Sequence, residues 1–235
     1  MKLPFICCGN TCCSPNAELL DAKIPQKDVE KLYDRTAWFY DFWAILTESK
    51  AQKRAIEIAD IQNGNTVLDV AVGTGRLFCK ILIQNPNGKN FGIDISQGML
   101  AKAKSKLSIQ GSQNYSLEIG SAFDIKMDDD SVDILFNNYM FDLIPFDQMD
   151  DIIKEFKRVM KPDGKLVLVN MTKGEKFGAN IYEFLYRISP KLMGGCRGVQ
   201  QSELLTQHGF QMKSREYVQQ MLFPSEVILA VRYDD

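Results

Sequence analysis

The chain has 235 residues, 45% of them hydrophobic, and a formal net charge of -2. This length and composition suit one ordinary domain with a sizeable core, and the lack of a dense Lys/Arg block argues against a nucleic-acid partner. No apolar run approaches the roughly 20 residues that span a bilayer, and the first residues lack the long apolar core of a secretory signal. We therefore expect a cytoplasmic protein with no transmembrane segment.

Residues 1–26 contain several prolines and four crowded cysteines, Cys7, Cys8, Cys12 and Cys13. Their spacing is not a usual zinc pattern, and we predict a flexible tail without a metal site. Binding of a soft metal or metalloid and acylation stay open as alternatives. Residues 27–61 then have helical spacing of apolar and aromatic side chains, which predicts two helices, about 27–46 and 49–61.

Residues 66–77, TVLDVAVGTGRL, form the organising motif. A short apolar run that includes Asp69 predicts a strand buried on both faces, and Ala71, Gly73 and Gly75 predict a tight turn into a helix. Glycines in such a turn let the backbone approach a nucleotide-like ligand. Phe78 stands where a dinucleotide fingerprint needs its third glycine, and no phosphate-loop lysine follows the glycines. The motif therefore matches neither a dinucleotide fingerprint nor the phosphate loop of NTPases.

A second predicted strand, 91–94, ends at Asp94, where a Rossmann-like fold places a carboxylate against ribose hydroxyls. An alternative role for Asp94 is that of an acid at the N-terminus of the next helix, 96–107, and the two roles are compatible. Farther along, the sequence predicts strands at 115–119, 132–136 and 165–171, with a helix at 146–160 and a turn at 161–164. It ends with a short helix at 202–207 and two strands, 210–221 and 227–233, joined around residues 223–225.

Three features together resemble class I S-adenosylmethionine (SAM)-dependent methyltransferases, and the quinone-biosynthesis (ubiquinone/menaquinone) group in particular. They are the acidic-x-Gly-x-Gly-x-Gly pattern with Ala71 in the first glycine slot, the Tyr-Asp-x-x-Ala-x-x-Tyr-Asp segment from Tyr33 to Asp41, and the Lys-Pro-Asp-Gly block at 161–164. The resemblance implies an α/β fold: a Rossmann-like, doubly wound sheet of seven strands with a C-terminal antiparallel hairpin. It also implies an N-terminal helical lid at 27–61 and a SAM-binding domain at 62–235.

The resemblance also implies a site. Its expected cofactor-binding residues are Tyr33, Asp69, Ala71, Gly73, Gly75, Asp94, Ile95, Met99, Ser121, Ala122, Asn137 and Asn138. Ser121 stands where the family usually has an aspartate for the adenine amino group, so backbone groups near Ala122 would have to serve instead. The loop after the strand at 132–136 is the expected reaction site, with Tyr139, Asp142 and Tyr40 as catalytic candidates.

The predicted function is therefore methyl transfer from SAM by in-line displacement to a small-molecule or lipid-like acceptor. The single histidine, His208, sits at a predicted helix end, which favours an acceptor that is already nucleophilic: a quinone precursor, an amine, a thiol or a metalloid. A lipid-like acceptor would be compatible with peripheral membrane contact. A non-catalytic SAM-binding protein and a dinucleotide-dependent oxidoreductase are the alternative functions.

Overall fold

The computed structural model describes residues 47–111, 113–172, 201–221 and 223–234. The predicted tail, the helix at 27–46, and Tyr33 and Tyr40 lie outside these ranges, as do all the cysteines except Cys79. None of the helices in the described ranges is long and apolar enough to cross a bilayer.

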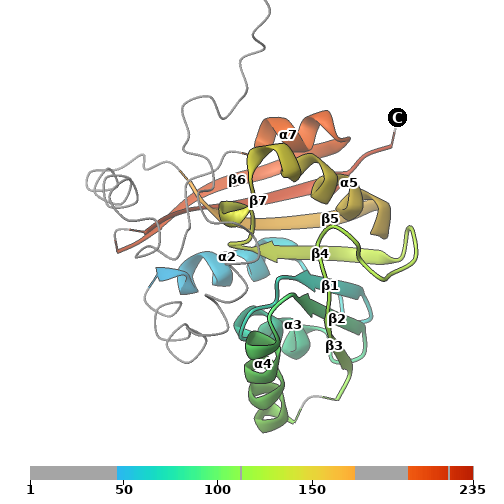
Figure 1. Cartoon of the computed structure of the whole chain (residues 1–235), viewed down its shortest axis with the longest axis vertical. Helices are drawn as coiled ribbons and strands as arrows, with labels where there is room; N and C mark the ends of the chain where they lie inside the picture. The colour runs from blue at the N-terminus through green and yellow to red at the C-terminus, as the bar shows by residue number, and fades with distance from the viewer. Residues whose placement is uncertain (1–46, 112, 173–200, 222, 235) are drawn as a thin grey trace, which may run out of the picture.

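Seven strands form one mixed sheet in the order β3-β2-β1-β4-β5-β7-β6 (Figure 1). The first five strands in the chain run parallel, and β7 is antiparallel to both of its neighbours, β5 and β6. The predicted fold class, including the C-terminal antiparallel hairpin, is confirmed. The strands are β1 (Thr66–Val70), β2 (Lys89–Asp94), β3 (Tyr115–Ile119), β4 (Val132–Asn138), β5 (Met160–Met171), β6 (Phe210–Gln220) and β7 (Phe223–Arg232).

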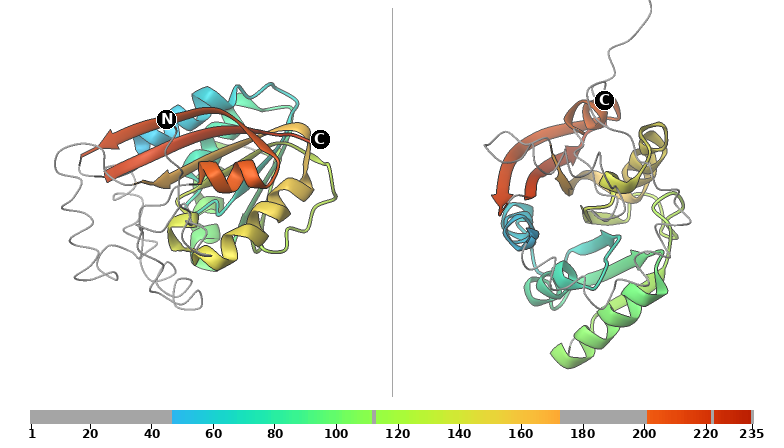
Figure 2. Two further views of the ribbon diagram at one scale, coloured as in Figure 1. Left: turned by 90° about the horizontal axis from the view of Figure 1, so that it is seen from above. Right: turned by 60° about the vertical axis from the view of Figure 1, so that its left-hand side comes forward.

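Helices cover both faces of the sheet (Figure 2). The core cluster on one face includes residues of α2 (Ser49–Ala59), α3 (Arg76–Gln84) and α4 (Gln97–Gln110). The cluster on the other face includes residues of α5 (Met149–Val159) and α7 (Ser202–Gln207). Two short 3₁₀ helices, Phe141–Leu143 and Phe146–Gln148, lead from β4 into α5.

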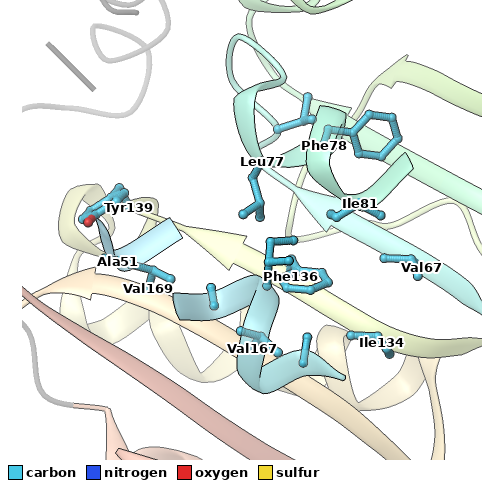
Figure 3. Packing of buried hydrophobic residues seen from close by; sticks show 14 of the residues in the cluster. Ala51, Val67, Leu77, Phe78, Ile81, Ile134, Phe136, Tyr139, Val167 and Val169 are labelled. Carbon is cyan, nitrogen blue, oxygen red and sulfur yellow. The ribbon is translucent and has the colours of Figure 1, made fainter. Parts of the chain in front are cut away.

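The central strands contain continuous apolar runs because they supply both clusters. Along β4, Ile134 and Phe136 face the α2–α3 side, and Leu135 between them faces the α5 side. Figure 3 shows Phe136 on the first of these sides with Leu77, Ile81 and Val167. A strand with helices on both sides needs such a run, which explains why the sequence shows no polar alternation there.

Two predicted turns proved to be parts of strands. Residues 161–164 lie inside β5, where the register shifts between the pairs Val132–Met160 and Ile134–Lys165. Asp163 takes the left-handed conformation there, at φ +61°. Residues 223–225 begin β7 instead of forming the hairpin turn, which lies between Gln220 and Phe223. Residues 161–164 fall in the gap between two pairs with β4, and residues 223–225 pair with residues 218–220 of β6, so the turn residues in both segments do not mark the ends of the strands.

Candidate active site

The site begins with the turn that joins β1 to α3. Its backbone is left-handed at Ala71, Gly73 and Gly75, with φ angles of +62°, +55° and +76°. The turn is held to the neighbouring strand by the Val72 amide, which donates to the Ile93 carbonyl at 3.0 Å. A Cβ at Gly73 would have no heavy atom within 4 Å, so this side of the turn faces open space.

Asp94, at the end of β2, reaches this turn. One carboxylate oxygen accepts from the Gly73 amide at 2.8 Å, and the other accepts from the Ser96 amide at 2.9 Å. Ser96 is itself the N-cap of α4, since its hydroxyl accepts from the Met99 amide at 3.1 Å. The predicted proximity of the glycine turn and the second strand's acid is therefore present, and the helix cap belongs to Ser96.

A cleft opens beside Gly73 and Asp94 at the carboxyl ends of β1, β2 and β4. It holds about 840 Å³ of space, part of which is open to solvent, and pockets for small molecules span roughly 300–1,000 Å³. The structure brings nine predicted site residues to its wall: Ala71, Gly73, Asp94, Ile95, Met99, Ser121, Ala122, Asn138 and Tyr139. Met140, Leu143 and Ile144, from the loop expected to be the reaction site, also line the cleft. Sequence reasoning missed Ser96, Gly120 and Phe123, although each lies shortly after a predicted strand.

The Ser121 hydroxyl takes part in the turn beside the cleft. Its oxygen accepts from the Phe123 amide at 3.2 Å, and this contact closes a tight turn after β3. The turn also includes the bond from the Asp124 amide to the Ser121 carbonyl, at 3.2 Å. Ser121 therefore shapes the wall of the cleft, while Ala122 and Phe123 complete it.

A second, smaller pocket of about 340 Å³ adjoins the cleft and shares Ala71, Gly73, Asn138 and Tyr139 with it. Its remaining wall comes from the start of α2, from β1, from the glycine turn and from the start of α3; the residues are Glu48, Gln52, Asp69, Val72, Thr74 and Arg76. α2 is fixed against β6 because the Arg54 guanidinium donates to the Glu216 carboxylate at 2.6 Å and 2.8 Å. Glu48 and Gln52 lie in the segment 27–61 that was expected to form a lid, but no motif singles out these two side chains.

Five buried side-chain atoms on the wall of this second pocket have no hydrogen-bond partner among the described residues. They are both carboxylate oxygens of Asp69, Gln52 Oε1, Asn138 Oδ1 and Arg76 Nε. Burial first, and then the neighbouring Asp94 carboxylate, raise the pKa of Asp69 well above its usual range. Because buried polar groups are normally satisfied, this concentration of acceptors indicates a place for a ligand that carries hydrogen-bond donors.

Three of the predicted site residues line neither the cleft nor the second pocket. Gly75 packs against α4, and a Cβ there would lie 3.0 Å from the Ala103 Cβ. Asn137 is fully buried, and its amide donates to the Val70 carbonyl at 2.8 Å. Asp142 is also fully buried, and its carboxylate accepts from the Met171 amide at 3.2 Å. These contacts give Gly75, Asn137 and Asp142 structural roles around the cleft.

Comparison with known proteins decides what class of protein this site belongs to. A family model described as a methyltransferase domain matches residues 61–208. A demethylmenaquinone methyltransferase of Lactobacillus johnsonii is 31% identical over 185 residues, which cover 74% of this chain and 75% of that protein. The chain belongs to the methyltransferase family. It is a SAM-dependent enzyme of class I that resembles the quinone-biosynthesis methyltransferases.

Solved structures share the fold of this methyltransferase. A SAM-dependent methyltransferase from Aquifex aeolicus superposes with a TM-score of 0.60 at 22% identity, and the match covers 89% of this chain and 99% of that one. Geranyl diphosphate C-methyltransferase from Streptomyces coelicolor, solved with S-adenosyl-L-homocysteine, gives a TM-score of 0.63 at 13% identity over 79% of each chain. At these identities the likeness concerns the fold.

The residues of this methyltransferase fit its cofactor, SAM. The ligand combines a ribose diol, an apolar and aromatic adenine, and a cationic methionine end. The cleft offers a carboxylate on Asp94 between apolar side chains such as Met99 and Leu143, and the second pocket offers the unpaired carboxylate of Asp69. The donors and charges that the ligand carries thus match the acceptors that the protein leaves available.

Proposed function

We propose that this methyltransferase holds the adenosine part of SAM in the larger cleft and the methionine end in the second pocket. Asp94 would accept hydrogen bonds from the ribose hydroxyls, with Ile95, Met99, Ser121 and Ala122 around the adenine. The observation that supports this most directly is the 2.8 Å contact between the Gly73 amide and the Asp94 carboxylate, on the wall of the cleft. It puts a fixed acceptor where backbone and ligand can lie close together.

Asp69 would serve the other end of the ligand. Its two oxygens have no partner in the described chain, and Gln52 and Asn138 each add an unpaired acceptor oxygen. An ammonium group carries three N–H donors and a positive charge, and so it suits a pocket where acceptors outnumber donors. Arg76, with its unpaired Nε, is placed to receive the carboxylate of the same ligand.

When bound, SAM supplies a methyl group on a sulfonium, which is already activated for displacement. The chain's own contribution is then to align the acceptor and exclude water. The candidate bases near the loop after β4 are engaged elsewhere: the Tyr139 hydroxyl lies 2.8 Å from Ser225 Oγ, and the Asp142 carboxylate accepts from the β5 backbone. We therefore propose an acceptor that needs no strong base.

Among such acceptors we favour a quinone precursor in its reduced, hydroquinone form. Ionisation of a ring hydroxyl gives the neighbouring ring carbon carbanion character, and that carbon loses its proton to solvent after it takes the methyl group from the sulfonium. Two observations support this choice over an amine, a thiol or a metalloid. Relatives at about 30% identity are named demethylmenaquinone methyltransferases. The loop after β4 also presents apolar side chains to the cleft, including Met140, Leu143 and Ile144, which suit a lipid-like molecule.

The test combines binding with turnover in the full-length protein. Asp94→Asn should weaken SAM binding in calorimetry by about 10-fold to 100-fold, the size expected for losing a charged hydrogen-bond acceptor. Asp133→Asn is a matched control, because Asp133 also accepts a backbone N–H, from Thr66 at 2.7 Å, but lies at the opposite end of β4. Its SAM affinity should equal that of the wild type.

Turnover is followed as transfer of a radiolabelled methyl group from SAM to a demethylmenaquinone analogue, with thiol and amine acceptors in parallel. Label in the quinone supports the proposed acceptor. Label in the thiol or amine alone would overturn the acceptor and leave the SAM site standing. Wild-type affinity in Asp94→Asn would overturn the ribose role of Asp94.

A further inference from the structure

Tyr139 occupies a special position between the two openings. It is the first residue after β4, it lines both the larger cleft and the second pocket, and only 6% of it is exposed. Its backbone is left-handed, at φ +52°, and its amide donates to the Val169 carbonyl at 2.6 Å. A non-glycine residue in this region costs on the order of 1 kcal/mol or more, so surrounding contacts have to hold it.

The contacts that hold the side chain come from β7. The Tyr139 hydroxyl and Ser225 Oγ share a hydrogen bond of 2.8 Å, and Ser225 is 1% exposed. The tyrosine ring packs on Phe223 with ring centroids 5.8 Å apart and planes tilted by 60°. Figure 3 shows Tyr139 beside Ala51 of α2, with which it shares a core cluster. The ring is therefore enclosed between α2, β4 and β7.

Ser225 can hold the Tyr139 hydroxyl in one position because the strand that carries Ser225 is itself held by backbone contacts. Ser225 pairs with Met171 in the antiparallel ladder between β5 and β7. The preceding carbonyl, of Pro224, accepts from the Thr172 amide at 3.1 Å. A hydroxyl fixed in this way determines where the far end of the tyrosine ring lies.

We propose that Ser225 is a positioning residue for the SAM site: it fixes the Tyr139 ring as the shared wall of the adenosine cleft and the methionine pocket. The role rests on the proposed function, since both openings are assigned to SAM there. It also replaces the role predicted for Tyr139 from the sequence. Because the Tyr139 hydroxyl is hydrogen-bonded to a buried serine, the side chain is held in one position. Its ring, and not its hydroxyl, then contacts the ligand.

The test is a double-mutant cycle in the full-length protein, with SAM as the probe. Ser225→Ala and Tyr139→Phe each remove one end of the same hydrogen bond and should each weaken SAM binding by about threefold to tenfold. The combined variant should bind SAM no more weakly than the weaker single variant, because both changes remove the same hydrogen bond. Tyr139→Phe retains the ring and covers the case in which Ser225→Ala does not fold.

Ser214→Ala is the matched control. Ser214 lies in the same hairpin, on β6, and its buried hydroxyl has no hydrogen-bond partner in the described chain. This variant should retain wild-type affinity for SAM. Peptide-level hydrogen exchange without ligand adds a direct readout: Ser225→Ala should speed exchange across residues 137–142, and Ser214→Ala should not.

The outcomes separate the two proposals. If the wild type does not bind SAM, the proposed function falls, and this role falls with it. If the wild type binds SAM but Ser225→Ala and Tyr139→Phe both keep its affinity, only the positioning role is overturned. Losses that multiply in the combined variant would also overturn it, because independent effects do not arise from one shared bond.

Discussion

At the scale of single residues, two acids near the glycine turn have opposite surroundings. Asp94 accepts from two backbone amides, whereas both oxygens of Asp69 are buried and have no partner within the described part of the chain. Burial raises the pKa of Asp69, and the Asp94 charge adds to the effect. Asp69 thus destabilises the protein without a ligand, and a cationic ligand would compensate for this.

Asp69→Asn should stabilise the ligand-free protein at neutral pH and weaken SAM binding. The folded-state pKa of Asp69 lies above its unfolded value, so the folded state keeps a proton that the unfolded state releases. Wild-type stability therefore falls as pH rises from about 4, the unfolded value, through the folded pKa. Urea unfolding should show the variant more stable by about 1–3 kcal/mol near pH 7, with the gap closing near pH 4.

The pH dependence of SAM affinity tests the same carboxylate. Affinity should rise with pH, whereas the stability of the ligand-free protein should fall. A cationic ligand favours the ionised carboxylate, so wild-type affinity should rise with pH through the folded pKa of Asp69, and Asp69→Asn should flatten this dependence. Asp133→Asn serves as the control again, because its carboxylate lies far from the turn. A wild type and an Asp69→Asn variant with the same pH profile for SAM binding would contradict the role of Asp69.

At the scale of secondary-structure elements, Gly75 lets α3 and α4 pack closely. A Cβ at this position would lie 3.0 Å from the Cβ and 3.2 Å from the Cα of Ala103, so the helices would have to separate. We expect Gly75→Ala to lose about 2–4 kcal/mol of unfolding free energy: about 1 for the left-handed backbone and the rest for overpacking.

Gly111→Ala provides a closely matched comparison for Gly75→Ala. Gly111 has the same φ, +76°, at the end of α4, but a Cβ there would have no heavy atom within 4 Å. It should lose only the backbone contribution, about 1 kcal/mol in the same denaturant experiment. Equal losses in the two variants would show that the contact with Ala103 does not matter.

Element boundaries were predictable where local pattern decides them. β3 and α7 have the predicted bounds, and β1 was recognised from its short apolar run before the glycines. The prediction was wrong at 161–164 and 223–225, where a Lys-Pro-Asp-Gly block and a proline resemble turns. Residues 161–164 form an irregularity inside β5, between two pairs with β4, and residues 223–225 already pair with the end of β6, so turn-forming residues alone do not locate these strand ends.

At the scale of the whole molecule, the candidate site could be predicted only in part. Asp94 and the glycine turn could be placed together because neighbouring parallel strands end at the same edge of a sheet. Glu48 and Gln52 could not, because the orientation of α2 depends on contacts such as the one between Arg54 and Glu216. The burial of Asp142 likewise depends on the β5 backbone, which no local pattern reveals.

SAM should stabilise the native state of the whole molecule, because it binds this state and not the unfolded chain. At a free concentration of about 100 times its dissociation constant, the gain is about 2.7 kcal/mol. For a domain of this size that corresponds to a rise in Tm of roughly 5–11 °C. The rise should be largely lost in Asp94→Asn and retained in Asp133→Asn.

NAD at the same concentration is the informative comparison in this thermal experiment. Phe78 occupies the position of the third fingerprint glycine and is fully buried in the core, so the turn lacks the dinucleotide pattern. We therefore expect NAD to leave Tm unchanged. A larger shift with NAD than with SAM would contradict the ligand assignment of the cleft, because both molecules carry adenosine and differ in what the second pocket must accept.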